Sequence, residues 1–289
     1  MTACSIWGLS PLFYRKLGHI DPLIIMAYRV IWGMFFLAFF LTFTGKLSGT
    51  LSLVKNYRVF FLLGCASLMI GINQFGFIYS ISAKQVIQAS FAYYIFPLIA
   101  VCLGFLFLKE KFSMIQLIAL LLALMAVVLL AKGLGHIPYI SVLLGVTFGI
   151  YGLIKSYLGL DSLQTVSVEI FLLCPIALCY LFILSLRSPE ILFHVSTTDF
   201  YMLAMSGLIT AVPLVLFSLS TSGLNYSTVG LVNYLNPTFQ FLVAVFIFSE
   251  PFTLIHGSSF GLIWISLFIY SSDAMRAEFS KSKKISSTE

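Results

Sequence analysis

Residues 113–132 read SMIQLIALLLALMAVVLLAK, and from Leu117 to Ala131 they carry no charged or hydrogen-bonding side chain. A helix of about 20 such residues spans the roughly 30 Å hydrocarbon layer of a bilayer. An uninterrupted apolar run of this length is typical of a helix that crosses a membrane rather than one in a soluble core.

Apolar segments of the same kind fill the rest of the chain. Apolar residues make up 60% of the 289 residues, charged residues only 9%, and the mean hydropathy is +1.06. Because soluble domains carry roughly 25% charged residues, this composition predicts an all-α membrane protein with no separate soluble domain. Polar, Gly or Pro breaks divide the chain into ten predicted transmembrane helices: 1–17, 23–43, 57–81, 86–108, 113–132, 137–156, 162–186, 199–221, 226–248 and 253–272.

The first predicted span is unusually short. Only about a dozen apolar residues precede Arg15 and Lys16, too few to cross a bilayer unaided. We expect either that the chain begins upstream of Met1 or that the first turns of this helix have been lost.

The basic residues predict an orientation, because Lys and Arg are retained on the cytoplasmic side during insertion. If the N-terminus is inside, ten Lys and Arg residues lie on the cytoplasmic side and five on the opposite side. Lys155, at the end of span 137–156, is one of the ten, and four others lie in the basic tail 273–289. Both termini are therefore expected in the cytoplasm. The net charge of +6 is spread over loops and this tail, which suits lipid headgroups rather than nucleic acid.

An internal repeat at an offset of 140 residues organises the chain. Aligning 79–113 with 219–253 without gaps gives these identities: Ser80/Ser220, Ser82/Ser222, Tyr94/Tyr234, Pro97/Pro237, Glu110/Glu250 and Phe112/Phe252. A Tyr-x-x-Pro lies mid-span in both copies, and the Glu closes the same helix in both. We therefore predict two five-helix repeats, 1–132 and 137–272. Since five is odd, the second is inverted, an arrangement typical of secondary transporters with a midplane solute site.

Pro97 and Pro237 are predicted to kink their helices. Each removes a backbone donor and frees the carbonyl four residues earlier, at Tyr93 and Asn233. In hydrocarbon these carbonyls need another partner, and a water-filled cavity would supply it. This hypothesis places five residues around a central solute cavity: Tyr93, Tyr94, Asn233, Tyr234 and Asn236. The alternative is an ordinary pair of proline kinks packed against Ser or Thr of a neighbouring helix.

Two charges lie well within predicted spans, Arg29 and Glu169, and they are also 140 residues apart. An ionisable residue at the bilayer centre costs roughly 2.5–3.5 kcal/mol, so each should face the protein interior. We hypothesise that they flank the cavity and either pair directly or bind opposite charges on a solute. A salt bridge that only fixes helix packing is the alternative.

Neutral amides and small residues in the spans are weaker signals. Asn73 and Gln74 are the best further candidates for solute binding, because adjacent amides are hard to satisfy by helix contacts alone. Close helix contacts are indicated by three patterns of small residues: Gly145-x-x-x-Gly149, Ala119-x-x-x-Ala123 and Gly257-x-x-x-Gly261.

The sequence favours a transporter over an enzyme. The five cysteines lack CxxC spacing, and no Walker A or HExxH motif occurs, so no metal, cofactor or catalytic residue is predicted. Glu169 is the candidate for proton coupling. The alternatives are uptake or exchange of a metabolite, for example S-adenosylmethionine, instead of efflux, an intramembrane enzyme, and a helical scaffold that transports nothing.

Several segments resemble one transporter family along nearly the whole chain. They are Ile6-Trp7-Gly8, Tyr28-Arg29-Val30-Ile31-Trp32, 71–79, 89–98, 107–112 and Tyr151-Gly152-Leu153-Ile154-Lys155. These segments look like the RarD branch of the drug/metabolite transporter superfamily, whose unit is the EamA domain. The resemblance implies a bundle of two inverted five-helix repeats in the bacterial inner membrane that exports or exchanges small metabolites or drugs such as chloramphenicol.

The chain departs from the pattern of that branch at three places. Where the branch shows His-Arg, Asn-Trp and Gly-Tyr-Phe-Ile-Asn-Pro, this chain has Tyr28-Arg29, Asn73-Gln74 and the run 92–97, Ala-Tyr-Tyr-Ile-Phe-Pro. Because these changes fall in the predicted cavity, we expect a solute different from that of better-known members.

Overall fold

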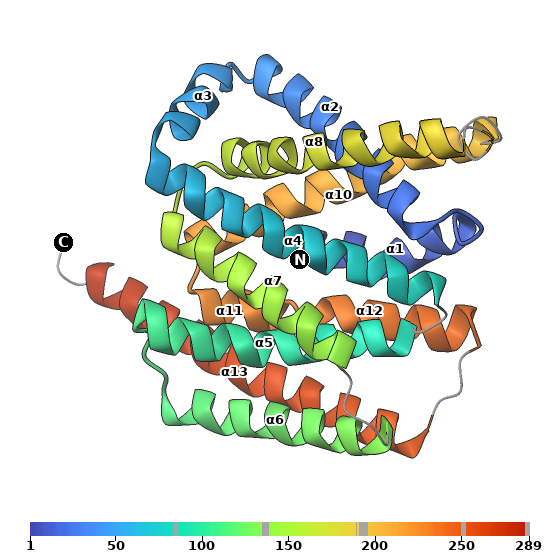
Figure 1. Ribbon diagram of the computed structural model, residues 1–289. Helices are drawn as coiled ribbons and strands as arrows, with labels where there is room; N and C mark the ends of the chain where they lie inside the picture. Colours follow the sequence, from blue (N-terminus) through green and yellow to red (C-terminus); the bar gives the residue numbers. More distant parts are fainter. Residues whose placement is uncertain (84–85, 135–138, 189, 191–195, 250–252, 287–289) are drawn as a thin grey trace.

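The computed structural model describes residues 1–83, 86–134, 139–188, 190, 196–249 and 253–286. Within these residues every regular element is a helix. In chain order the elements are α1 (Thr2–Lys16), α2 (Pro22–Phe43), α3 (Leu47–Lys55), α4 (Tyr57–Ser82), α5 (Val86–Leu108), α6 (Met114–Leu134), α7 (Tyr139–Leu158), α8 (Ser162–Arg187), α10 (Thr197–Gly223), α11 (Tyr226–Val232), α12 (Leu235–Leu242), η1 (Val243–Ile247) and α13 (Leu254–Ser286) (Figure 1).

Seven stretches of these helices are long and apolar enough to cross a membrane. They are Pro22–Phe43, Tyr57–Ser82, Met114–Gly133, Tyr139–Leu158, Ser162–Arg187, Thr197–Gly223 and Tyr226–Ile247, and shorter apolar helices cover Ala92–Leu108 and Gly257–Tyr270. The prediction of an all-α membrane protein is confirmed. Large apolar side chains on the outside of the bundle, such as Leu121 and Met125 of α6, are more than half exposed, as expected where lipid is the solvent.

The helices pack as a bundle around one interior. Figure 1 shows α6 and α13 side by side along one edge, with α5, α11 and α12 next to them and α2, α8 and α10 at the opposite edge. Helix α7 packs on both α4 and α5, while α1 packs on α10 and α12. The interior is therefore built from helices of the first and second parts of the chain together.

Three elements differ from the sequence prediction, and one of them is α13, which continues beyond the predicted span 253–272 to Ser286 in the predicted tail. Helix α3 occupies residues expected to be a loop; Leu47, Leu51 and Val54 on it are exposed, as in a short helix lying at a membrane surface. The predicted span 226–248 is not one α-helix but the sequence α11, α12 and the π-helical η1. The interruption falls at Asn233 and Tyr234, three residues before Pro237, where the missing N–H and the ring of proline disfavour a continuous helix.

Side-chain caps fix the starts of several helices. The Asp21 carboxylate accepts the N–H of Leu23 at the start of α2, and the Asp161 carboxylate accepts the N–H of Gln164 at the start of α8. Asp161 also accepts a hydrogen bond from Lys46, which lies just before α3. Burial by itself would raise the pKa of Asp161, but the bonds from Lys46 and from the backbone N–H groups outweigh it and lower the pKa below 3.8.

We expect Asp161 to make stability pH-dependent. Because its folded pKa is the lower one, its contribution is complete above the usual value of 3.8 and is lost as the pH falls through the folded pKa. Replacing Asp161 with Ala should cost about 1 kcal/mol, chiefly through the cap, since an exposed ion pair adds little. Thermal unfolding of wild type and Asp161→Asn between pH 7 and pH 3 checks this. Asn keeps the capping oxygen but cannot titrate, so equal losses of stability in both proteins would contradict the assignment.

Candidate functional site

A cavity opens inside the bundle where helices from both parts of the chain meet. The space inside it that is open to a water molecule is about 30 Å³, enough for roughly two waters, so in this conformation the cavity is narrower than a small-molecule site. It lies toward the end of the bundle where α1 and α4 finish and α2 and α5 begin. The side chains that line it come from α1, α2, α4, α5, α7 and α10: Trp7, Ser10, Tyr14, Arg29, Ile70, Asn73, Gln74, Phe77, Tyr93, Phe148 and Ile209.

Among the described residues of this lining Arg29 is the only charged one, and it is 4% exposed. Its Nε donates to the hydroxyl of Thr210 on α10 at 2.8 Å, and its guanidinium carbon lies 5.4 Å from the centre of the Tyr14 ring. Its Nη1 is buried and has no hydrogen-bond partner in the part of the chain that the structure describes. Since a buried guanidinium normally pairs with an anion or several acceptors, this cation is incompletely satisfied.

The two amides predicted from the sequence differ in their bonding. The Asn73 amide nitrogen donates to the carbonyl of Leu144 on α7 at 2.7 Å, a contact that holds α4 against α7. The Gln74 Oε1 is buried, and none of the described residues donates a hydrogen bond to it. Tyr93 lies edge-on to Phe77, with ring centroids 5.8 Å apart. The lining thus combines unused polar atoms with aromatic walls.

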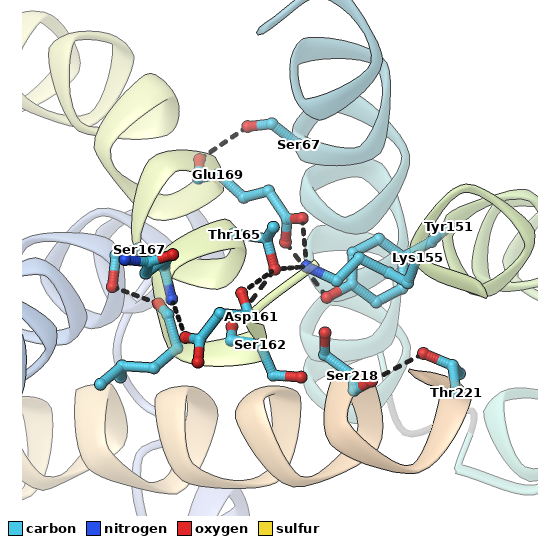
Figure 2. A network of polar contacts seen from close by, with 12 residues as sticks. Ser67, Tyr151, Lys155, Asp161, Ser162, Thr165, Ser167, Glu169, Ser218 and Thr221 are labelled. Atoms are coloured by element: carbon cyan, nitrogen blue, oxygen red, sulfur yellow. Dashed lines mark hydrogen bonds and ion pairs between the residues drawn. The ribbon is translucent and has the colours of Figure 1, made fainter. Parts of the chain in front are cut away.

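Glu169 is not part of this cavity and does not pair with Arg29. Its carboxylate accepts from Lys155 Nζ at 2.7 Å and from the Tyr151 hydroxyl at 3.1 Å, while Lys155 also donates to Thr165 at 2.5 Å. Figure 2 shows Lys155 and Tyr151 of α7 pointing at Glu169 of α8, and both charged side chains are 1% exposed. The hypothesis of a direct pair between Arg29 and Glu169 is therefore wrong, because Lys155 supplies the cation.

Packed aromatic rings lie between the cavity and this ion pair. Phe148 lines the cavity, and its ring centroid lies 6.0 Å from that of Tyr151, whose hydroxyl binds Glu169. Around Phe148 pack Trp7 at 5.5 Å, Phe96 at 4.7 Å and Phe217 at 4.8 Å, measured between ring centroids. We call these five side chains, Trp7, Phe96, Phe148, Tyr151 and Phe217, the aromatic cluster. It closes the cavity on the side of the ion pair.

Comparison with known proteins places the chain in a family. Residues 1–132 match the EamA-like transporter family. The uncharacterized transporter YojE of Bacillus subtilis is 36% identical over 92% of this chain and 89% of its own length, and protein RarD of Streptomyces exfoliatus is 33% identical over 95% and 87%. The chain belongs to the RarD branch of the drug/metabolite transporter superfamily. A solved crystal structure with 15% identity has a TM-score of 0.71 over 95% of this chain and 96% of its own, which shows a shared fold.

In this RarD-branch protein four predicted site residues meet at the cavity, namely Arg29, Asn73, Gln74 and Tyr93. The other predicted residues do not line it. Tyr94 and Tyr234 pack against each other in the core with ring centroids 6.2 Å apart. The Asn233 carbonyl accepts the N–H of Asn236 at 3.0 Å, so a tight turn rather than a water-filled cavity supplies its partner. Asn236 Oδ1 accepts from Gln240 on the same helix.

The two predicted kinks also differ from each other. Pro237 lies just after the break between α11 and α12, whereas α5 runs as one helix from Val86 to Leu108 through Pro97. The expectation that both proline helices open the same backbone groups to a cavity is therefore wrong for Asn233. The local sequences differ as well, since Asn233 and Asn236 stand where α5 has Tyr93 and Phe96, and asparagine favours a helix less.

Several residues that line the cavity or form the buried ion pair were not predicted from the sequence. Trp7, Ser10 and Tyr14 of α1 line the cavity, but the short first span gave no reason to single them out. Lys155 was counted as a cytoplasmic cation, although it is buried. A spacing of four connects Tyr151 to Lys155 and Thr165 to Glu169, which places each pair on one helix face, and this signal could have predicted the ion pair.

Proposed function

We propose that this protein is a secondary transporter that moves a small organic solute, such as a metabolite, an amino-acid-like compound or a drug, across the bacterial inner membrane by alternating access at the central cavity. The observation that carries this proposal is the cavity itself. It lies between helices of both parts of the chain and is lined by a buried, incompletely paired cation.

Alternating access needs one end of the bundle closed while the other is open. The cavity lies toward one end, and the aromatic cluster with the Lys155–Glu169 pair blocks the route toward the other. The aromatic cluster joins α7 to α1, α5 and α10, so a movement of α7 relative to these helices would open it. The ion pair joins α7 to α8 and breaks only if those two helices move apart. We take the cluster and the ion pair as the closed gate of this conformation.

We further propose ten membrane spans in two inverted five-helix repeats, 1–132 and 137–272, followed by the tail 273–289. The starts of four helix pairs support it, since each pair is offset by 140 residues: Pro22/Ser162, Tyr57/Thr197, Val86/Tyr226 and Met114/Leu254. Lys109 and Ser249, another pair at this offset, both have a φ of 55°, an uncommon backbone conformation for residues other than glycine. Both termini would then face one side, and the distribution of Lys and Arg favours the cytoplasm.

Reconstituted protein tests the proposal. Liposomes containing it are screened for flux of labelled amino acids, S-adenosylmethionine and chloramphenicol, which shows whether a metabolite or a drug is accepted. We expect Arg29→Ala to lower the flux of the accepted solute at least ten-fold, because it removes the only charge among the described residues of the cavity lining. Lys16→Gln, which removes an exposed charge of the same sign, is the matched control. Equal flux through wild type and Arg29→Ala would contradict the proposed site.

Proton coupling through Glu169 requires its bond to Lys155 to break during the cycle. If Glu169 carries the proton, Glu169→Gln abolishes the stimulation of flux by a pH gradient while solute exchange without a gradient persists. Unchanged stimulation in Glu169→Gln would leave Glu169 as a gate residue only.

A further inference from the structure

Three buried polar atoms on residues of the cavity lining have no hydrogen-bond partner among the described residues. They are the Tyr14 hydroxyl, Arg29 Nη1 and Gln74 Oε1, and their residues are at most 6% exposed. A buried polar group that lacks a partner costs free energy, and native proteins keep such groups chiefly where something else binds them. The position of these atoms around one cavity indicates a ligand with matching polar atoms.

The chemistry of these atoms restricts the ligand. Arg29 Nη1 can only donate, Tyr14 can donate, and the guanidinium lies 5.4 Å from the Tyr14 ring centre, so both reach the same part of the cavity. Two donors, one of them cationic, match an anionic oxygen group. Among the described residues of the lining none is acidic, and Glu169 is neutralised by Lys155 behind the aromatic cluster. The cavity therefore carries an uncompensated positive charge.

The single cation of the described lining limits the charge of the ligand, and the apolar side chains of the lining indicate the shape of its uncharged part. A phosphate dianion would need more than the single Arg29, whereas a carboxylate matches one guanidinium fork. The same cavity is lined by aromatic and aliphatic side chains. The aromatic ones are Trp7, Phe77, Tyr93 and Phe148, and the aliphatic ones are Ile70 and Ile209. Flat apolar groups pack well against such walls.

We infer that the transported solute is a monoanionic carboxylate with a planar apolar body, its carboxylate held by Arg29 and Tyr14 and its body between the aromatic side chains of the cavity. These side chains must part to admit it, because the cavity in this conformation has room for water only. This inference rests on the proposed transport function and specifies the solute of the same cavity. Thr210 is a positioning residue in this arrangement, because its hydroxyl accepts a hydrogen bond from Arg29 Nε and leaves the Nη groups of the guanidinium for the ligand. Gln74 offers its amide to a further polar atom of the solute.

The test compares three probes of equal size and different charge: 3-phenylpropanoate, 3-phenylpropanamide and 3-phenylpropylammonium. The chain has three tryptophans, and Trp7 is the one in the cavity, so a Trp32→Phe/Trp264→Phe variant in lipid nanodiscs reports binding through Trp7 fluorescence. We expect a Kd for the propanoate at least ten-fold below that for the amide, and the weakest binding for the ammonium. Equal affinities for acid and amide, or binding of none of the three, would overturn the inference.

Variants identify the group that selects the anion. Arg29→Gln should bring the ratio of amide to acid Kd down to about one while amide binding persists, which also shows that the variant is folded. Arg29→Lys should keep a preference for the acid but a smaller one, since it retains the charge without the fork. Thr210→Val should weaken the acid several-fold and leave the amide unchanged, whereas Lys16→Gln should change neither. An acid preference that survives Arg29→Gln would overturn the assignment.

The outcomes separate this inference from the transport proposal. If the acid binds through Arg29 but liposomes containing the protein do not exchange it faster than protein-free liposomes, the ligand assignment stands and transport of that solute class fails. If liposomes exchange the amide or the ammonium as fast as the acid, transport stands and the carboxylate assignment is wrong.

Discussion

Lys155→Met is expected to destabilise the folded protein by about 3–5 kcal/mol, because it leaves the Glu169 carboxylate buried without its cation. Both side chains are 1% exposed, so water cannot replace the lost partner. The remaining bond from the Tyr151 hydroxyl is a single neutral donor and does not compensate a full charge. The free energy of unfolding, measured in micelles by denaturant titration, is the appropriate quantity.

The pair itself is expected to contribute much less than its rupture costs. Lys155→Met/Glu169→Leu removes both charges and leaves apolar side chains of similar size, so its stability should lie within about 2 kcal/mol of wild type. Lys16→Met replaces an exposed lysine and serves as the control for the substitution itself. A single variant Lys155→Met that loses less than about 1 kcal/mol would show that water or another group reaches Glu169.

The fold was predictable where hydrophobicity alone decides it. The predicted spans 113–132, 162–186 and 199–221 agree with α6, α8 and α10 to within about two residues, because a bilayer requires long apolar runs with few polar interruptions. The same criterion cannot detect α3, whose nine residues are too short to span a bilayer. Hydrophobicity also cannot locate the helix break at Asn233. That break depends on Pro237 in the same segment and on the groups that form hydrogen bonds with the turn.

The site was predictable only in part, for a different reason. Arg29, Asn73 and Gln74 are conspicuous because polar groups are costly in a membrane, and all three line the cavity. Tyr94 and Tyr234 were predicted as cavity residues from the internal repeat, yet their side chains face each other in the core. The repeat identifies the helix on which a residue lies but not the direction of its side chain. Lys155 was hidden because a cation near the end of a span looks like an interfacial residue.

Small-residue patterns show the same limit for helix contacts. Gly145 and Gly149 do lie against α5: a Cβ on Gly145 would come within 3.2 Å of the Ala92 carbonyl oxygen. A Cβ on Gly261, from an equally good Gly-x-x-x-Gly pattern, would meet no atom within 4 Å. A close approach between α2 and α10 occurs at Gly207, which belongs to none of the predicted patterns, because spacing describes one helix and a contact needs two.

Gly207→Ala should disrupt this contact severely. A Cβ at this position would lie 2.5 Å from the backbone nitrogen of Gly33 and 2.7 Å from the backbone carbon of Trp32. These are backbone atoms of a packed helix, so no side-chain rotation can relieve the overlap and α2 and α10 must move apart. We expect a loss at the upper end of the roughly 1–3 kcal/mol typical of overpacking, with weaker solute binding because Arg29 and Thr210 lie on these two helices.

Gly33→Ala is the matched control, because it adds the same methyl group to the opposite side of the same helix pair. A Cβ on Gly33 would come no closer than 3.7 Å to Gly207 or Ile170, an ordinary contact distance, so its stability should stay within about 0.5 kcal/mol of wild type or rise slightly. Unfolding free energies of the two alanine variants, measured side by side, decide the matter. If Gly207→Ala is tolerated as well as Gly33→Ala, α2 and α10 do not approach this closely, and the bond between Arg29 and Thr210 that positions the guanidinium loses its structural basis.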